Sequence, residues 1–124
     1  MIHLKQSISF YKTDNLHLTR AFYEGTLGLK LIKDQTHCHI YELTATSAIG
    51  FCTHHPKNKT SDACLTFVFE VRESVDRWYQ TLQRKGLNPT QPKVSERFKI
   101  YHFFVRDPND YMVEFQLFLS QTND

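Results

Sequence analysis

The 124-residue sequence has no long apolar run, no large excess of one charge and no closely spaced pair of cysteines. Without an apolar run of sufficient length, we expect neither a signal peptide nor a membrane span. The 15 basic and 13 acidic residues are interleaved, and the formal net charge is +2. Because this balance leaves no basic stripe, nucleic acid and anionic membranes are poor candidates for partners.

The cysteines are few, and their spacing fits no metal or redox motif. Cys38, Cys52 and Cys64 are odd in number and lack C-x-x-C spacing. This usage predicts reduced thiols in a cytoplasmic protein, and neither a disulfide framework nor a zinc site. Seven histidines are more than usual, so a metal site has to be judged from where they lie.

The apolar content is that of one folded domain. Hydrophobic residues make up 40% of the chain and aromatic residues 14%, which is enough for a core without cross-links. We therefore expect a single domain over residues 1–124.

Residues 98–118 carry the clearest structural signal in the sequence. Two β-rich runs flank the turn formers of residues 107–110, a pattern that predicts a hairpin. Alternation gives it one wholly apolar face and a second face that carries His102, Phe104, Met112, Glu114 and Gln116. A carboxylate among Phe and Met side chains is costly to bury unless it pairs or binds a ligand. The alternative is an ordinary solvated sheet face.

The order of the expected elements repeats once along the chain. Each half has a strand, a helix and three further strands, and a polar, proline-containing segment separates the halves. The first helix begins at Thr13-Asp14-Asn15, and the second is expected to be capped by Ser74 and stopped by Gly86. The pattern predicts an α+β fold of two β-α-β-β-β modules, over residues 5–54 and 63–119, with a linker at residues 55–62.

Because a helix covers one face of each sheet, we expect the open faces to form a cup-shaped, mostly antiparallel sheet around a shared cleft. Alternation places a set of polar groups on that open face: Ser7, Ser9, Tyr11, Cys52, His54, Thr66, His102, Glu114 and Gln116.

Three segments resemble the vicinal oxygen chelate superfamily. Residues 22–29 (FYEGTLGL) are similar to its F-Y-x-x-x-L-G helix end, residues 69–75 (FEVRESV) to its second strand-to-helix junction, and residues 107–115 (DPNDYMVEF) to its D-P-(D/N)-G-x-x-x-E hairpin. Asp110 replaces the usual glycine of that turn. The superfamily includes glyoxalase I, fosfomycin-modifying transferases, extradiol dioxygenases and bleomycin-binding resistance proteins. The resemblance implies paired modules around one metal or ligand site.

The resemblance also implies where metal ligands would lie. The closing carboxylate of the second module falls on Glu114, which is present. The first-strand ligand falls on residues 7–9, the opening ligand of the second module at Thr66, and the closing position of the first module at residues 50–52. None of these has the expected histidine or carboxylate. We therefore expect no bound metal, although a divalent ion held by Glu114 and His102 with Cys52 or His54 stays open.

The resemblance implies two classes of function, and a third class does not depend on it. The first is metal-free binding of a small organic ligand, as in the bleomycin-binding proteins, with Ser7, Ser9, Tyr11, Cys52, His54, Thr66, Phe104, Met112 and Gln116 as contacts. The second is a metal-dependent lyase, isomerase or dioxygenase, in which Glu114 and His102 are the only plausible acid/base pair. The third is an interaction module whose cleft is filled by its own side chains. A homodimer is expected because family members of this length commonly pair.

Overall fold

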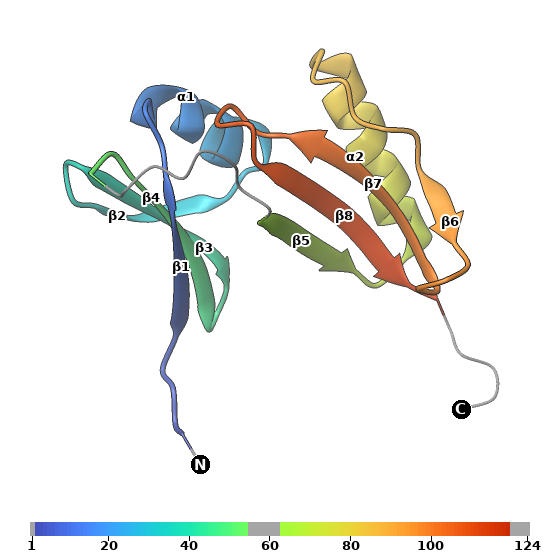
Figure 1. The fold of residues 1–124 in the computed structure, drawn as a ribbon, viewed down its shortest axis with the longest axis horizontal. Helices are drawn as coiled ribbons and strands as arrows, with labels where there is room; N and C mark the ends of the chain where they lie inside the picture. Colours follow the sequence, from blue (N-terminus) through green and yellow to red (C-terminus); the bar gives the residue numbers. More distant parts are fainter. Residues whose placement is uncertain (1, 55–62, 120–124) are drawn as a thin grey trace. The chain divides into compact units, whose positions relative to one another are not determined.

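The computed structural model describes residues 2–54 and 63–119, so the predicted linker at residues 55–62 lies outside the described residues. The chain divides into two compact units, Met1–Thr60 (unit 1) and Ser61–Asp124 (unit 2). Each unit has one four-stranded sheet and one helical segment (Figure 1). No helix among the described residues is long and apolar enough to cross a membrane.

The elements follow the predicted order in both units. Unit 1 contains β1 (Ser7–Lys12), α1 (Leu16–Arg20), the π-helix η1 (Ala21–Thr26), β2 (Lys30–Asp34), β3 (Cys38–Thr44) and β4 (Ser47–Cys52). Unit 2 contains β5 (Cys64–Phe69), α2 (Arg72–Arg84), β6 (Lys93–Ser95), β7 (Ile100–Arg106) and β8 (Met112–Phe118).

The two sheets have the same topology. Their strand orders are β1-β4-β3-β2 and β5-β8-β7-β6. In each sheet the first strand pairs with the last in parallel, and the other neighbours are antiparallel. The α+β fold of two β-α-β-β-β modules with open sheets is therefore confirmed. The shared cleft stays a prediction.

Local signals explain one helix start and not the other. The side chain of Asn15 accepts a hydrogen bond of 2.9 Å from the backbone N–H of Leu18, as an N-cap should. Ser74, by contrast, lies inside α2, which begins at Arg72 without a side-chain cap. A cap is worth about 1 kcal/mol, which is less than burial of the Val75 and Leu82 side chains provides.

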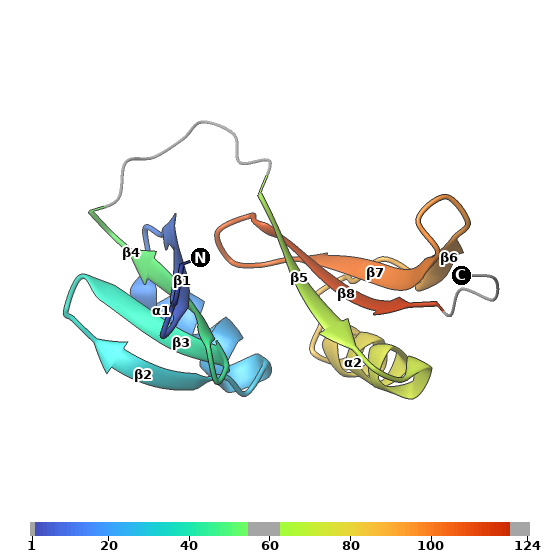
Figure 2. The ribbon, with the colours of Figure 1, turned by 90° about the horizontal axis from the view of Figure 1, so that it is seen from below.

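Aromatic packing attaches α2 to one face of the unit 2 sheet (Figure 2). The Phe103 and Phe115 rings stack with centroids 4.8 Å apart. From the helix, Tyr79 meets Phe103 at 5.6 Å and Trp78 meets Phe115 at 6.0 Å. This apolar face is the one that alternation predicts for the hairpin, so Glu114 and its neighbours lie on the opposite, helix-free face.

In unit 1 the predicted faces of β1 are wrong. Tyr11 is in register with Phe51 and lies 5.9 Å from its ring, while Phe51 packs 4.6 Å from Tyr23 of η1. Tyr11 therefore belongs to the helix-covered side, together with Ser7 and Ser9, which alternate with it. The apolar residues Ile8 and Phe10 occupy the helix-free side instead.

Phe10 lies directly against the backbone of Gly50. The two residues are in register across the parallel β1–β4 pair. A Cβ atom added at Gly50 would come within 2.5 Å of two carbons of the Phe10 ring. Glycine is therefore favoured at this position because the neighbouring ring occupies the space of a side chain.

We expect Gly50→Ala to lower the free energy of unfolding by about 1 kcal/mol, at the low end for overpacking because the half-exposed Phe10 ring can shift. The measurement is urea unfolding of the two single variants and of the double variant Phe10→Ala/Gly50→Ala. With the ring removed, the alanine should cost almost nothing. A cost that is unchanged in the Phe10→Ala background would show that the ring contact is not the cause.

The prediction of three reduced thiols is wrong for two of the cysteines. Cys38 and Cys52 face each other on neighbouring strands and form a disulfide, and only Cys64 is free. The physical reason is the β3–β4 register, which places them opposite each other despite a sequence separation of 14. The inference from unpaired cysteines to a reducing compartment therefore no longer holds.

Tyr41 carries a buried hydroxyl group in the unit 1 core. Its side chain is fully buried, and the oxygen has no hydrogen-bond partner among the described residues. Burial raises the pKa of Tyr41 to about 12, because the phenolate is poorly solvated there. The neutral phenol is thus the form that the folded unit accommodates.

We expect Tyr41→Phe to raise the free energy of unfolding by about 1 kcal/mol, since it removes an unpaired buried hydroxyl. An unfolded tyrosine titrates near pH 10, whereas the folded unit keeps Tyr41 neutral up to about pH 12. Titration of Tyr41 therefore leaves the free energy of unfolding of the wild type unchanged below pH 10 and lowers it between pH 10 and about 12. The advantage of the variant should therefore widen over this interval in chemical unfolding. A constant difference between variant and wild type would contradict the assignment.

Candidate functional site

A carboxylate, an imidazole and a hydroxyl meet on the helix-free face of unit 2. Each carboxylate oxygen of Glu114 has its own hydrogen-bond partner. The Thr66 hydroxyl donates to Oε1 of Glu114 at 2.8 Å, and Nδ1 of His102 lies 2.7 Å from Oε2. The His102 and Glu114 side chains are 11% and 12% exposed. We refer to His102 and Glu114 as the dyad.

Strand register brings these three residues together from three strands. Thr66 on β5 is directly opposite Glu114 on β8 in the parallel pair. On the other side of β8, Phe104 of β7 is opposite Glu114 and His102 is opposite Gln116. His102 therefore reaches Glu114 diagonally, which long side chains on one sheet face can do.

Apolar side chains lie beside the dyad on this face, and Lys93 and Arg106 share it in register with His102 and Met112. The Phe104 ring lies 5.1 Å from the His102 ring, and Met112 and Gln116 flank Glu114 along β8. Val68 and Phe118 are 55% and 62% exposed. Six predicted site residues thus share the face that alternation assigns them: Thr66, His102, Phe104, Met112, Glu114 and Gln116.

Cys64 also lies on this face, two residues before Thr66. Its sulfur is 3.9 Å from the Thr66 hydroxyl. Desolvation raises the pKa of the Cys64 thiol; the Thr66 hydrogen bond opposes this rise, and the Glu114 carboxylate adds a smaller one. A thiol with a raised pKa is a weak nucleophile at neutral pH, so the chemistry of this face centres on the dyad.

The five site residues predicted in unit 1 do not form one group. Ser7, Ser9 and Tyr11 lie on the helix-covered side of β1, away from the side expected for ligand contacts. Cys52 is in the disulfide, and His54 lies just beyond β4, with Nδ1 3.8 Å from Sγ of Cys38. Cys38 was missed by sequence reasoning, although its register with Cys52 follows once the β3–β4 hairpin is centred on its turn.

Possible metal ligands near Glu114 are few among the described residues of unit 2. Such sites need three or four ligand atoms converging on one ion. The dyad supplies two, and no third His, Cys, Asp or Glu joins them among the described residues of unit 2. In unit 1 the helix-free side of the parallel strands carries Phe10 opposite Gly50, which offer no ligand, followed by Lys12 opposite Cys52.

A family model of the Glyoxalase/Bleomycin resistance protein/Dioxygenase superfamily matches residues 3–115. The chain belongs to this superfamily. The match spans both units, as the repeated β-α-β-β-β order and the hairpin sequence predicted. No protein of curated function matches the sequence.

Solved structures of the superfamily share the fold at low sequence identity. A lactoylglutathione lyase from Agrobacterium tumefaciens is 15% identical with a TM-score of 0.75, over 90% of this chain and 91% of that one. A fosfomycin resistance protein from Mesorhizobium loti is 14% identical with a TM-score of 0.70, over 98% and 96%. A glyoxalase/bleomycin resistance protein/dioxygenase from Nocardioides is 12% identical with a TM-score of 0.79, over 100% and 91%.

We expect Thr66→Val to lower the free energy of unfolding by about 1 kcal/mol, because Oε1 of Glu114 loses its donor. Thr66 is exposed on the edge strand β5, so water can replace part of the lost hydrogen bond, and we expect no larger loss of stability. Thr66→Ser keeps the hydroxyl and is the matched control in urea unfolding. A loss confined to the Ser variant would mean that the methyl packing, and not the hydrogen bond, is responsible.

Proposed function

We propose that the helix-free face of unit 2 binds a small organic molecule without a metal, with the dyad as its polar anchor. One observation carries the proposal: a carboxylate with a fixed orientation lies beside the apolar side chains of Phe104 and Met112. Binding sites for small molecules combine apolar walls with a few polar groups that fix the ligand's orientation. Glu114 and His102 are those groups, and Phe104 and Met112 supply apolar contact area.

The donor set supports binding without a metal. The position opposite Glu114 on the parallel strand is Thr66, whose hydroxyl donates to the carboxylate. A histidine there would present a nitrogen lone pair to an ion, as the superfamily pattern implies. Because the ligand positions that the resemblance implies in unit 1 have neither a histidine nor a carboxylate, we treat the metal site of the family as degraded in this chain.

A second candidate function is metal-free acid/base catalysis, and the dyad geometry favours it. Glu114 accepts from Nδ1 of His102, which leaves Nε2 without a hydrogen-bond partner among the described residues. In that arrangement Nε2 can take a proton from a bound molecule while the carboxylate stabilises the imidazolium. The reaction class would be an isomerisation or a lyase step on a small substrate. A metal-dependent lyase, isomerase or dioxygenase around Glu114 would need further donors.

A homodimer and a cytoplasmic location remain predictions. The dimer is inferred from family resemblance and from the exposed edges of the two open sheets, at β1 and β2 and at β5 and β6. A gel-filtration mass at the monomer value would contradict it.

The binding proposal is tested by thermal shift against a panel of small aromatic and carboxylate-free organic molecules. A ligand that raises the melting temperature of the wild type should bind Glu114→Gln and His102→Ala at least about tenfold more weakly, as expected when a charged hydrogen-bonding group is lost. His17→Ala, an exposed histidine on α1, is the matched control and should bind normally. A ligand that binds all four proteins equally would exclude the dyad as its anchor.

Metal dependence is decided on the same proteins. Oxidised wild type and Glu114→Gln, purified without chelator, are analysed by elemental mass spectrometry and titrated with Mn²⁺, Fe²⁺, Ni²⁺ and Zn²⁺. We expect no binding that depends on Glu114. Stoichiometric binding that Glu114→Gln abolishes would overturn the metal-free proposal in favour of a metalloenzyme.

A further inference from the structure

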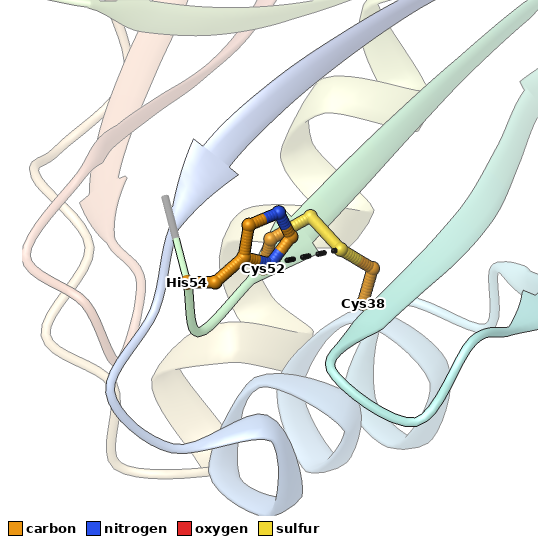
Figure 3. A group of neighbouring side chains, drawn as sticks. All are labelled: Cys38, Cys52 and His54. Carbon is orange, nitrogen blue, oxygen red and sulfur yellow. Dashed lines mark hydrogen bonds between the residues drawn. A yellow bond between two sulfur atoms is a disulfide. The ribbon is translucent and has the colours of Figure 1, made fainter. Parts of the chain in front are cut away.

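A second group of chemically reactive side chains lies at one end of the β3–β4 pair in unit 1 (Figure 3). It consists of the Cys38–Cys52 disulfide and of His54, whose Nδ1 is 3.8 Å from Sγ of Cys38. The three ligand atoms lie within 4.8 Å of one another. This cluster is built from unit 1 alone and shares no residue with the dyad.

The backbone holds the three residues in place. Cys38 and Cys52 are opposite each other in the antiparallel register. Beyond Cys52, the N–H of Thr53 donates to the carbonyl of His37 at 2.9 Å, which ties the chain down immediately before His54. On the other strand, the N–H of Gln35 donates to the carbonyl of Cys38 at 2.8 Å. The cluster is therefore fixed by main-chain hydrogen bonds and does not depend on the sulfur–sulfur bond alone.

The spacing is close to that of a tetrahedral zinc site. With Zn–S near 2.3 Å and Zn–N near 2.0 Å, two ligand atoms of a tetrahedron are about 3.5–3.8 Å apart. The distance from His54 to Cys38 already has this length. Only the two sulfurs are closer, because they are bonded to each other. Opening that bond lets rotation about the cysteine side chains bring the sulfurs to the required separation.

We propose that the reduced pair Cys38 and Cys52, together with His54, binds one Zn²⁺ ion, and that the disulfide excludes it. Two thiolates and an imidazole are ligand types that zinc prefers, and a water molecule completes the tetrahedron. The two cysteines are buried at 7% and 2% exposure, whereas His54 is exposed. The ion would therefore enter from the His54 side, and the site is gated by the oxidation state of the cysteines.

The chemistry balances with a dithiol reductant. The reductant gives two electrons and two protons to the disulfide, the sulfur–sulfur bond breaks into two thiols, and the reductant becomes a disulfide. Zinc then binds both sulfurs as thiolates and neutral His54, and two protons are released.

The experiment is a titration of the full-length chain with Co²⁺ as a spectroscopic probe, followed by displacement with Zn²⁺. One sample is oxidised and one is reduced with a phosphine under anaerobic conditions, and titration of thiols checks the state of all three cysteines. The reduced chain should bind one equivalent of Co²⁺, with thiolate charge-transfer and tetrahedral d–d absorption that Zn²⁺ abolishes. The oxidised chain should show neither absorption.

Matched variants assign the ligands. Reduced Cys38→Ser should lose the charge-transfer absorption by about half or more, and His54→Ala should weaken binding on the order of tenfold or more, since each removes one of three protein ligands. Cys64→Ser and His17→Ala should bind as the wild type does, and so should Glu114→Gln, which separates this site from the dyad. Circular dichroism verifies that each variant is folded.

Three results would overturn the proposal. The first is no stoichiometric binding by the fully reduced wild type, which needs no substitution and so cannot be explained by misfolding. The second is equal binding by the oxidised chain. The third is binding that survives Cys38→Ser and His54→Ala or disappears in Cys64→Ser.

Discussion

The parallel pairing of the first and last strand in each unit determines which side chains can act together. In unit 2 this pairing sets Thr66 beside Glu114, and the antiparallel neighbour β7 then brings His102 to the other carboxylate oxygen. A shift of β8 by one residue would move Glu114 to the apolar face packed against α2, away from Thr66 and His102. The dyad thus depends on register, and the register is maintained by the stacked Phe103 and Phe115 rings on the opposite face.

The same strand pairing carries different chemistry in unit 1. There the side chain of Phe10 lies over Gly50, so the position is apolar and filled by the chain itself. The reactive groups lie at one end of the neighbouring antiparallel β3–β4 pair, where Cys52 and His54 meet Cys38. One backbone arrangement therefore supports an oxygen and nitrogen site in one unit and a sulfur and nitrogen site in the other.

The sequence predicts the element order, both helices and the hairpin face that carries Glu114, because alternation and helical spacing are strong there. It fails for β1, where small serines and Tyr11 alternate with Ile8 and Phe10. The more apolar set was assigned to the helix side, but Phe51 and Tyr23 leave room there for the Tyr11 ring. The disulfide was missed for another reason: cysteine counting ignores register, whereas Cys38 and Cys52 pair through the hairpin between them.

Glu114 itself does not decide between a metal site and a metal-free one. An ionised carboxylate has about four lone-pair positions, and Thr66 and His102 use two of them. Lone pairs therefore remain for an ion or for a ligand that donates hydrogen bonds. What differs from the family pattern is the neighbour of Glu114. The pattern implies a histidine at position 66, whereas this chain has a threonine whose hydroxyl donates to the carboxylate. In our proposal, the threonine at position 66 makes this carboxylate an oriented acceptor beside a histidine.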